Sequence, residues 1–201
     1  MDYLLIALMW AAYCALHSFL ISIRFTNLMK RLLKAYYAFY RLFYNIISVV
    51  LLIPLIIYSI QTEGEAIISY SLPFTIIRYI FISISILIVL KAFFIDYDFL
   101  TFFGIRQLFE FGRKKSQEHS NEIKRNGLLG VVRHPMYFGL MIYLWCQTFS
   151  LTDVVINSVL TIYIIIGTYL EEKKLVLEFG DTYIKYQCEV PMLIPFTKEK
   201  G

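Results

Sequence analysis

The chain has 201 residues, of which 59% are hydrophobic, 17% aromatic and only 17% charged. This composition excludes an ordinary soluble domain of that length and indicates an integral membrane protein. Nucleic-acid binding is not expected despite the net charge of +4, because the basic residues stand in short segments beside apolar runs, as membrane topology requires. Three cysteines without a CxxC spacing predict neither a disulfide framework nor a metal site.

Two apolar runs in the first 60 residues are predicted to cross the membrane. Residues 3–23 carry no formal charge and are long enough to cross, and residues 42–60 form a second span with Pro54 as a kink. The segment 24–41 between them holds five basic residues and no acid, which predicts a cytoplasmic loop and an N-terminus outside. Because the first run follows Asp2 without a basic region, we expect it to stay as a helix.

A third span is predicted over residues 73–95, with Arg78 and Lys91 near its two ends. Both side chains are long enough to extend toward the membrane surface, although a charge within a span can also be functional. The polar and basic segment 96–133 that follows is predicted to be cytoplasmic. Within it, residues 99–111 are aromatic and apolar with few charges, which favours an amphipathic helix along the interface.

Residues 136–152 and 154–170 are two uncharged runs of 17 residues with the single acid Asp153 between them. Each run is about 25 Å long as a helix, near the lower limit for crossing the hydrocarbon, so the pair is predicted to form an antiparallel membrane hairpin. Its two ends would then return to one membrane face. The charged residues gathered there are Arg133, His134, Glu171 and Glu172.

The last 30 residues are more polar but keep an apolar stripe at helical spacing, which predicts a helix that packs back against the bundle. The stripe consists of Leu175, Val176, Phe179, Tyr183 and Tyr186, and Pro191 and Pro195 end it. No internal repeat is present. The sequence therefore predicts one all-α membrane domain over residues 1–201, with five transmembrane helices, a C-terminal helical hairpin and a cytoplasmic C-terminus.

Several short motifs carry a resemblance to known enzymes. Those at the C-terminal end are Gly127-Leu128-Leu129, Arg133-His134-Pro135-Met136-Tyr137, Gly139, Glu171-Glu172, Leu175, Phe179-Gly180, Tyr183, Tyr186 and Val190-Pro191. Together they resemble the isoprenylcysteine carboxyl methyltransferase and phospholipid methyltransferase superfamily. Further short matches are His17-Ser18, Tyr40-Arg41, Tyr44-Asn45, Phe103-Gly104-Ile105-Arg106-Gln107 and Val190-Pro191-Met192-Leu193-Ile194-Pro195. These are similar to one branch, the methanethiol S-methyltransferase and NnrU-like proteins.

The resemblance implies an integral membrane enzyme of a prokaryotic inner membrane, in contact with lipid, that binds S-adenosyl-L-methionine on the cytosolic side through residues 127–195. The residue types agree with that cofactor. Glutamates can accept from its ammonium or ribose, His134 and the backbone donors after Pro135 can hold its carboxylate, and tyrosine rings can face its adenine or sulfonium. The expected cofactor-binding residues are Arg133, His134, Tyr137, Gly139, Glu171, Glu172, Tyr183 and Tyr186. Each of these residues also has a purely structural alternative. The basic residues can anchor the helix at the lipid headgroups, the glutamates can be solvated, and the tyrosines can serve packing.

The branch implies methylation of a small or lipophilic thiol such as methanethiol, with His17, Tyr44 and Arg106 as candidates for the catalytic environment. One departure concerns the acceptor. In the prenylcysteine and thiol enzymes that the chain resembles, an arginine usually precedes the Val-Pro pair, whereas this chain has Glu189. Because that arginine is expected to help hold a substrate carboxylate, its absence disfavours a prenylcysteine as the acceptor. Prenylcysteine carboxyl and phospholipid amine acceptors remain alternatives within the enzyme class. From another class, a non-catalytic NnrU-like membrane accessory protein remains open.

Overall fold

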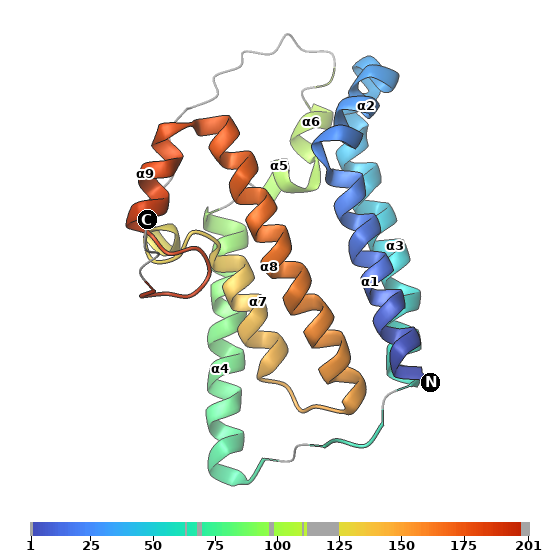
Figure 1. Cartoon of the computed structure of the whole chain (residues 1–201), viewed down its shortest axis with the longest axis vertical. Helices are drawn as coiled ribbons and strands as arrows, with labels where there is room; N and C mark the ends of the chain where they lie inside the picture. The colour runs from blue at the N-terminus through green and yellow to red at the C-terminus, as the bar shows by residue number, and fades with distance from the viewer. Residues whose placement is uncertain are drawn as a thin grey trace. The chain divides into compact units, whose positions relative to one another are not determined.

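The structure, a computed structural model, describes residues 2–62, 64–67, 70–96, 99–109, 111 and 125–197. These residues form helices and connecting segments, and no strand occurs among them (Figure 1). The α-helices are α1 (Asp2–Ile21), α2 (Ile23–Leu33), α3 (Tyr40–Gln61), α4 (Leu72–Lys91), α5 (Phe99–Phe103), α6 (Ile105–Phe109), α7 (Pro135–Trp145), α8 (Leu151–Phe179) and α9 (Asp181–Glu189). Three further turns are a 3-10 helix at Lys34–Phe39, a π-helix at Ala92–Asp96 and a 3-10 helix at Gly127–Gly130.

The chain divides into two compact units. The first comprises Met1–Ile67, Phe99–Gln117 and Phe149–Leu160, and the second comprises Ile68–Asp98, Glu118–Thr148 and Thr161–Gly201. Helix α8 contributes its first residues to one unit and the rest to the other. The all-helical fold class predicted from the sequence is confirmed for the described residues.

In the first unit, α1 packs along α3 (Figure 1). Ile6 and Trp10 of α1, Leu55 of α3 and Ile156 at the start of α8 form a buried cluster in this unit. The indole Nε1 of Trp10 donates to the Ser59 hydroxyl at 3.0 Å, so the one polar group of this ring is satisfied inside the apolar cluster.

Two hydrogen bonds fix the start of α8 against the residues that follow α3. The Thr152 hydroxyl donates to the Thr62 carbonyl at 3.1 Å, and the Ile67 amide donates to the Phe149 carbonyl at 2.7 Å. The loop after α3 and the segment before α8 therefore lie side by side within this unit.

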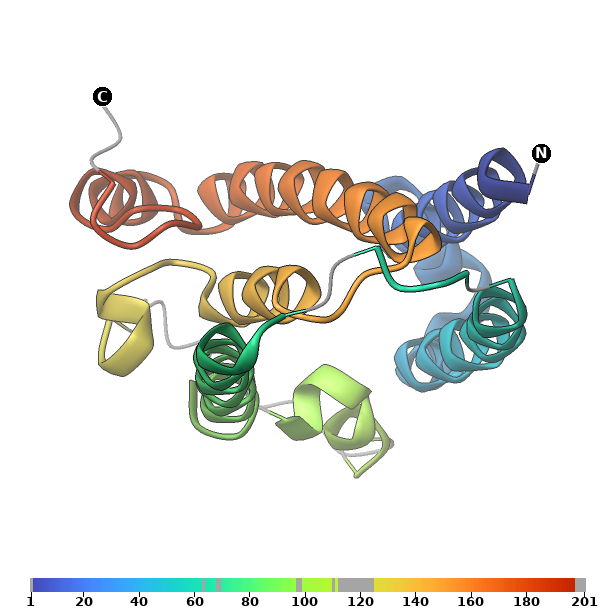
Figure 2. The same ribbon diagram turned by 90° about the horizontal axis from the view of Figure 1, so that it is seen from below.

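In the second unit, α4 packs along α7, as Figure 2 shows. Gly139 lies at their closest approach, because a Cβ atom there would be 2.9 Å from Val89 Cγ2 and 3.1 Å from the Ser85 carbonyl oxygen. Only a residue without a side chain lets the two backbones come this close, as is common between membrane helices.

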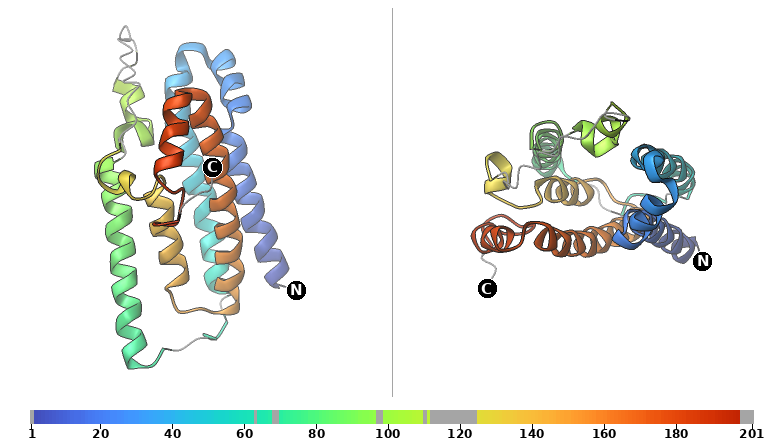
Figure 3. Two further views of the ribbon diagram at one scale, coloured as in Figure 1. Left: turned by 60° about the vertical axis from the view of Figure 1, so that its left-hand side comes forward. Right: turned by 90° about the horizontal axis from the view of Figure 1, so that it is seen from above.

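Four helical segments are long and apolar enough to cross a membrane by length and composition. They are Tyr3–Ile21, Ile23–Gln61, Leu72–Ile95 and Leu151–Phe179. They include the first, second, third and fifth of the predicted spans. The second segment is longer than predicted, because residues 24–41, which were expected to be a loop, form α2 and a 3-10 turn before α3 (Figure 3).

The predicted fourth span, 136–152, is wrong in its extent. Helix α7 has 11 residues and ends at Trp145, so it is only about 16 Å long. Asp153 lies in the first turn of α8 and not in the hairpin turn. Its carboxylate accepts from the Ser150 amide at 2.8 Å, and its own amide donates to the Ser150 hydroxyl at 3.2 Å. This reciprocal capping starts a new helix at Leu151.

The antiparallel arrangement of the hairpin is confirmed within the second unit. The Tyr137 hydroxyl donates to Glu171 at 2.9 Å, and Trp145 Nε1 donates to the Thr161 hydroxyl at 2.9 Å. Residue numbers thus rise along α7 as they fall along α8, and α7 lies beside the middle of α8.

The predicted interfacial helix over residues 99–111 is also wrong in its extent, because two short helices, α5 and α6, occupy this segment. Gly104 separates them with a φ of +82°. A Cβ there would lie 2.9 Å from both Arg41 Cβ and Leu42 N. The position needs glycine both for its backbone conformation and for this approach.

Candidate functional site

The motif residues that the sequence predicted to meet at one end of the hairpin do meet there, around Glu172. Glu172 is buried, with 4% of the residue exposed. Arg133 donates to its carboxylate through Nε at 2.9 Å and through Nη2 at 2.8 Å, which forms a bidentate ion pair. His134 Nε2 lies 2.8 Å from the same carboxylate and must donate, since an ionised carboxylate only accepts. Tyr183 donates at 2.7 Å, and the Gln187 side-chain amide donates as well.

Arg133 ties this carboxylate to the C-terminal segment. Its Nη1 donates to the Gln187 carbonyl at 2.9 Å and to the Val190 carbonyl. Its backbone amide donates to Pro191 at 2.9 Å, and the next amide, of His134, donates to Met192 at 3.1 Å. The buried Arg133 guanidinium therefore finds its partners inside the protein, on α8 and at the end of α9.

Helix α9 is placed by two tyrosines on one of its faces. Tyr183 and Tyr186 are three residues apart and pack edge to face, with ring centroids 5.7 Å apart. They form a buried cluster with Val190, against Leu175, Val176 and Phe179, which confirms the predicted apolar stripe. The Tyr186 hydroxyl donates to the Leu129 carbonyl at 2.5 Å. Burial, together with the hydrogen bond to Glu172 and its negative charge, raises the pKa of Tyr183 well above its usual range, so Tyr183 remains a donor.

Glu171 lies in a different setting from its neighbour. Its side chain is 38% exposed, and it accepts from the Tyr137 hydroxyl at 2.9 Å. His134 Nδ1 lies 3.9 Å from it, and the His134 ring stacks on the Tyr137 ring at a centroid distance of 5.6 Å. His134 thus stands between the two glutamates, with one ring nitrogen toward each.

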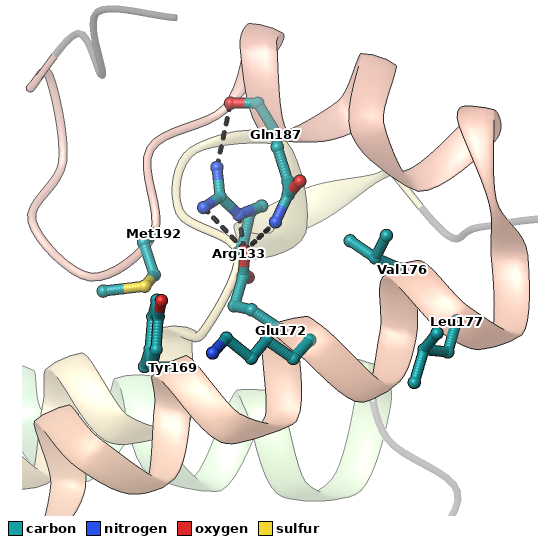
Figure 4. Close-up of a pocket in the computed structure, with 8 residues that line it drawn as sticks. Arg133, Tyr169, Glu172, Val176, Leu177, Gln187 and Met192 are labelled. Atoms are coloured by element: carbon teal, nitrogen blue, oxygen red, sulfur yellow. Dashed lines mark hydrogen bonds and ion pairs between the residues drawn. The ribbon is translucent and has the colours of Figure 1, made fainter.

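A pocket of about 540 Å³ lies beside the Glu172 ion pair (Figure 4). Its lining residues are Arg133, Tyr169, Glu172, Lys173, Val176, Leu177, Gln187 and Met192. Apolar side chains and one aromatic ring make most of the wall, and Lys173 Nζ lies 4.4 Å from the centroid of the Tyr169 ring. The volume is within the range of small-molecule sites in proteins.

Tyr169 and Lys173 line the pocket, although neither belongs to a motif named above. The signal was present, because Tyr169, Lys173, Val176 and Leu177 recur at the spacing of one helical face. Glu171 is about 200° from Tyr169 around α8, so it points away from the pocket and toward α7.

Two further motif residues have local explanations. Gly139 contacts α4, where its packing alone requires glycine. Glu189, which stands where an arginine was expected, forms an ion pair with Arg125 Nη1 at 2.6 Å. The Arg125 guanidinium also lies 5.5 Å from the centroid of the Tyr186 ring. A basic group is therefore present beside this position, but it comes from the segment before α7.

The three catalytic candidates belong to the first unit. The Tyr44 hydroxyl lies 2.7 Å from His17 Nε2, and His17 Nδ1 lies 3.3 Å from the Ser48 hydroxyl. Tyr44 and Ser48 are buried and His17 is half-buried, so α1 and α3 share a polar cluster inside an apolar pair of helices. Arg106 lies on α6 with an exposed side chain.

Comparison with known protein families bears on this arrangement. A family described as a protein of unknown function, DUF1295, matches residues 6–182. The chain belongs to the DUF1295 family. The match includes His17, Tyr44, Arg133 and Glu172, so this DUF1295 sequence pattern extends over both units.

Curated relatives of this DUF1295 chain carry one name. A methanethiol S-methyltransferase from Crocosphaera subtropica is 36% identical over 127 residues, which are 63% of this chain and 49% of that protein. One from a Pseudomonas species is 39% identical over 94 residues, 46% of this chain and 36% of the relative. Methanethiol S-methyltransferase 2 from Bradyrhizobium diazoefficiens is 35% identical over 100 residues, which are 49% of this chain and 38% of that protein.

The DUF1295 chain thus spans about half the length, or less, of the curated relatives it matches. The resemblance to the methanethiol S-methyltransferase branch is confirmed by these matches. No solved structure matches the chain significantly.

Proposed function

We propose that this protein is an integral membrane methyltransferase that uses S-adenosyl-L-methionine and methylates a small thiol, such as methanethiol, to a thioether. The observation that carries the proposal is the Glu172 cluster. It joins the Arg133-His134 motif to the glutamate pair and to Tyr183, and these are motifs that the resemblance assigns to a methyltransferase. The printed names of the relatives support the same reaction.

The pocket beside Glu172 has the chemistry that this cofactor requires. Tyr169, Val176, Leu177 and Met192 offer an apolar and aromatic wall for an adenine ring. Lys173 carries the charge opposite to the cofactor's carboxylate. When bound, S-adenosyl-L-methionine supplies a methyl group on a positively charged sulfur.

In this proposal, four of the candidate residues act by holding Glu172 and the pocket wall. Arg133, His134 and Tyr183 donate to Glu172, and Tyr186 fixes α9 to Leu129. Glu171 and Tyr137, on the α7 side of α8, remain candidates for direct contact with the cofactor. Variants on the two sides of α8 distinguish these two arrangements.

For the acceptor, we propose that His17 and Tyr44 form the environment in which the thiol loses its proton. Transfer from a sulfonium to a thiolate joins a cation and an anion into neutral products, so a water-poor site favours it. The buried Tyr44 hydroxyl and the His17 imidazole can accept or relay the thiol proton. Arg106 is a further candidate, through its charge. A prenylcysteine carboxyl or a phospholipid amine is the alternative acceptor.

We also propose that the chain is one membrane domain with five crossings, with the N-terminus outside and the glutamate pair at the cytosolic face. The five basic residues between α1 and the first turn of α3 favour that orientation. The fourth crossing would combine α7 with the irregular segment before α8. Phe149 and Ser150 of that segment are buried in protein, as non-helical backbone within a membrane must be.

The deciding experiment is turnover by the purified protein in nanodiscs, with S-adenosyl-L-methionine and, in parallel, methanethiol, a longer alkyl thiol, a prenylcysteine and phosphatidylethanolamine. We expect release of S-adenosylhomocysteine and a methylated thiol. If only the prenylcysteine or only the lipid were methylated, the proposed cofactor would stand and the proposed acceptor would change from a thiol to that compound. Absence of cofactor binding in equilibrium dialysis would overturn the enzyme proposal and favour an accessory protein.

A further inference from the structure

Helix α2 is a separate helix and not an extension of α1. Ser22 between them has an extended backbone, with ψ at 147°, and its hydroxyl accepts from the Phe25 amide at 3.3 Å. This is an N-cap, which starts a new helix in a new direction. At the other end, Lys34 has a φ of +48° and turns the chain into the 3-10 turn that leads to α3 (Figure 3).

The two sides of α2 differ in character. At about 100° per residue, one arc carries apolar side chains and the opposite arc carries polar and basic ones. The apolar arc consists of Phe25, Leu28, Met29, Leu32 and Leu33, and the polar arc consists of Arg24, Thr26, Asn27, Lys30 and Arg31. The helix is therefore amphipathic, apart from Ile23, its first residue, which lies on the polar arc.

No residue of α2 is buried. Leu32 is 64% exposed and Leu28 is 48% exposed. The described part of the chain thus leaves most of the apolar arc uncovered. An amphipathic helix whose apolar arc has no cover within the protein needs an apolar surface from outside.

The orientation of α2 is fixed at its first turn. The Phe25 ring lies 4.7 Å from the Phe19 ring of α1 and 6.3 Å from the Tyr40 ring of α3, measured between centroids. The Tyr40 hydroxyl donates to the Leu20 carbonyl at 2.7 Å, which holds the ends of α1 and α3 together. These contacts of the first turn set which arc of α2 faces outward.

The charge around α2 selects the kind of surface. From residue 3 to residue 62 the sequence has no acid, and its five basic residues all lie between 24 and 41. Three of them, Arg24, Lys30 and Arg31, are on the polar arc of α2 and exposed. A surface that is apolar beneath and negatively charged above matches both arcs, and a bilayer with anionic headgroups has that profile.

We propose that α2 lies in the plane of the membrane interface, with Leu28 and Leu32 among the acyl chains, and binds anionic phospholipid headgroups through Arg24, Lys30 and Arg31. In this position α2 forms a lipid-binding site at the membrane surface. This site is independent of the cofactor pocket, and its test requires neither cofactor nor turnover.

The depth of the helix is tested with the full chain in nanodiscs of mixed phosphatidylglycerol and phosphatidylcholine. Cys14, Cys146 and Cys188 are replaced by alanine, and a single nitroxide-labelled cysteine is placed at Leu32 or at Asn27. These positions lie on opposite arcs of the same helix, so each is the control for the other. We expect oxygen to relax the Leu32 label and an aqueous nickel chelate to relax the Asn27 label. Equal access of the chelate to the Leu32 and Asn27 labels would overturn the proposal. The apolar arc would then be a binding surface for a soluble protein partner.

The headgroup preference is tested in detergent micelles by native mass spectrometry of retained lipid. The wild-type chain is expected to retain phosphatidylglycerol over phosphatidylcholine, and K30Q/R31Q to lose about fivefold in preference for each charge removed. The matched control, K174Q/K185Q, removes two exposed charges elsewhere. An equal loss in both variants would show a net-charge effect and overturn the site, as would an unchanged preference in K30Q/R31Q.

Discussion

Arg133 and Glu172, 39 positions apart in the sequence, form a bidentate ion pair in which each residue is 4% exposed. Removing two charges from water is costly, and the attraction between them offsets that cost only when the remaining donors and acceptors are also satisfied. Here Glu172 accepts from four side chains, and Arg133 donates to two backbone carbonyls in addition. The pair therefore holds α8, α9 and the segment before α7 in one arrangement.

Replacing Glu172 with glutamine is expected to destabilise the second unit. The amide has the shape of the carboxylate but no charge, so Arg133 stays buried without a counter-ion. Loss of one partner of a buried pair costs about 3 to 5 kcal/mol. Thermal unfolding in detergent, followed by intrinsic fluorescence, measures the effect. Glu178→Gln is the control, because Glu178 lies on the same helix with an exposed side chain. Equal midpoints for the two variants would contradict the structural role of Glu172.

Replacing Lys173 with glutamine is expected to weaken S-adenosyl-L-methionine binding by about threefold to tenfold, through loss of one charged contact to the cofactor's carboxylate. Lys174→Gln is the matched control, since Lys174 is adjacent and does not line the pocket. Isothermal titration calorimetry supplies both dissociation constants. If Lys173→Gln binds as the wild type does while Glu171→Gln and Tyr137→Phe bind more weakly, the cofactor lies on the α7 side of α8 instead.

Replacing Tyr44 with phenylalanine removes the hydroxyl beside His17 and leaves the ring. If this pair assists deprotonation of the thiol, kcat/KM for the thiol falls by about a hundredfold while the dissociation constant of the cofactor stays the same. Tyr36→Phe serves as the control, because Tyr36 is 68% exposed. A Tyr44→Phe enzyme with wild-type kcat/KM across the pH range would remove Tyr44 from the proposed thiol site.

Alanine at Gly139 is expected to be less stable than alanine at Gly167 by about 1 to 3 kcal/mol. The Cβ at Gly139 would meet the Ser85 carbonyl, which cannot move without α4, whereas nothing lies within 4 Å of a Cβ at Gly167. Both changes raise helix propensity equally, so their difference isolates the contact between α4 and α7. Unfolding midpoints of the two single variants, measured in the same detergent, give this difference.

Long apolar runs are the part of this fold that the sequence predicts well. The spans expected at 3–23, 42–60 and 73–95 correspond to helices within a few residues, because length and charge alone determine them. The end of α7 was missed since an unbroken uncharged run hides a change from helix to turn. The signal available was Ser150, three residues before Asp153, which is a capping sequence at a helix start.

The gathering of the charged motifs at one end of the hairpin also follows from the sequence, but the division of roles between the two glutamates does not. Adjacent residues differ by about 100° around a helix, and residues 154–170 carry no formal charge that would mark the inner face of α8. The hydrogen bonds that Glu172 accepts from Arg133, His134 and Tyr183 fix this rotation. Thr168, four residues earlier on the same face, is buried as well.

The carbonyls of Gln187, Val190, Pro191 and Met192 that receive Arg133 and His134 belong to a late part of the chain. During synthesis, Arg133 is translated well before these four residues, so the site around it is completed only after the chain has reached Met192. A product cut short before Val190 would lack the carbonyls of Val190, Pro191 and Met192. Its Arg133 guanidinium would keep Glu172 and Gln187 as partners, but the backbone amides of Arg133 and His134 would lose theirs.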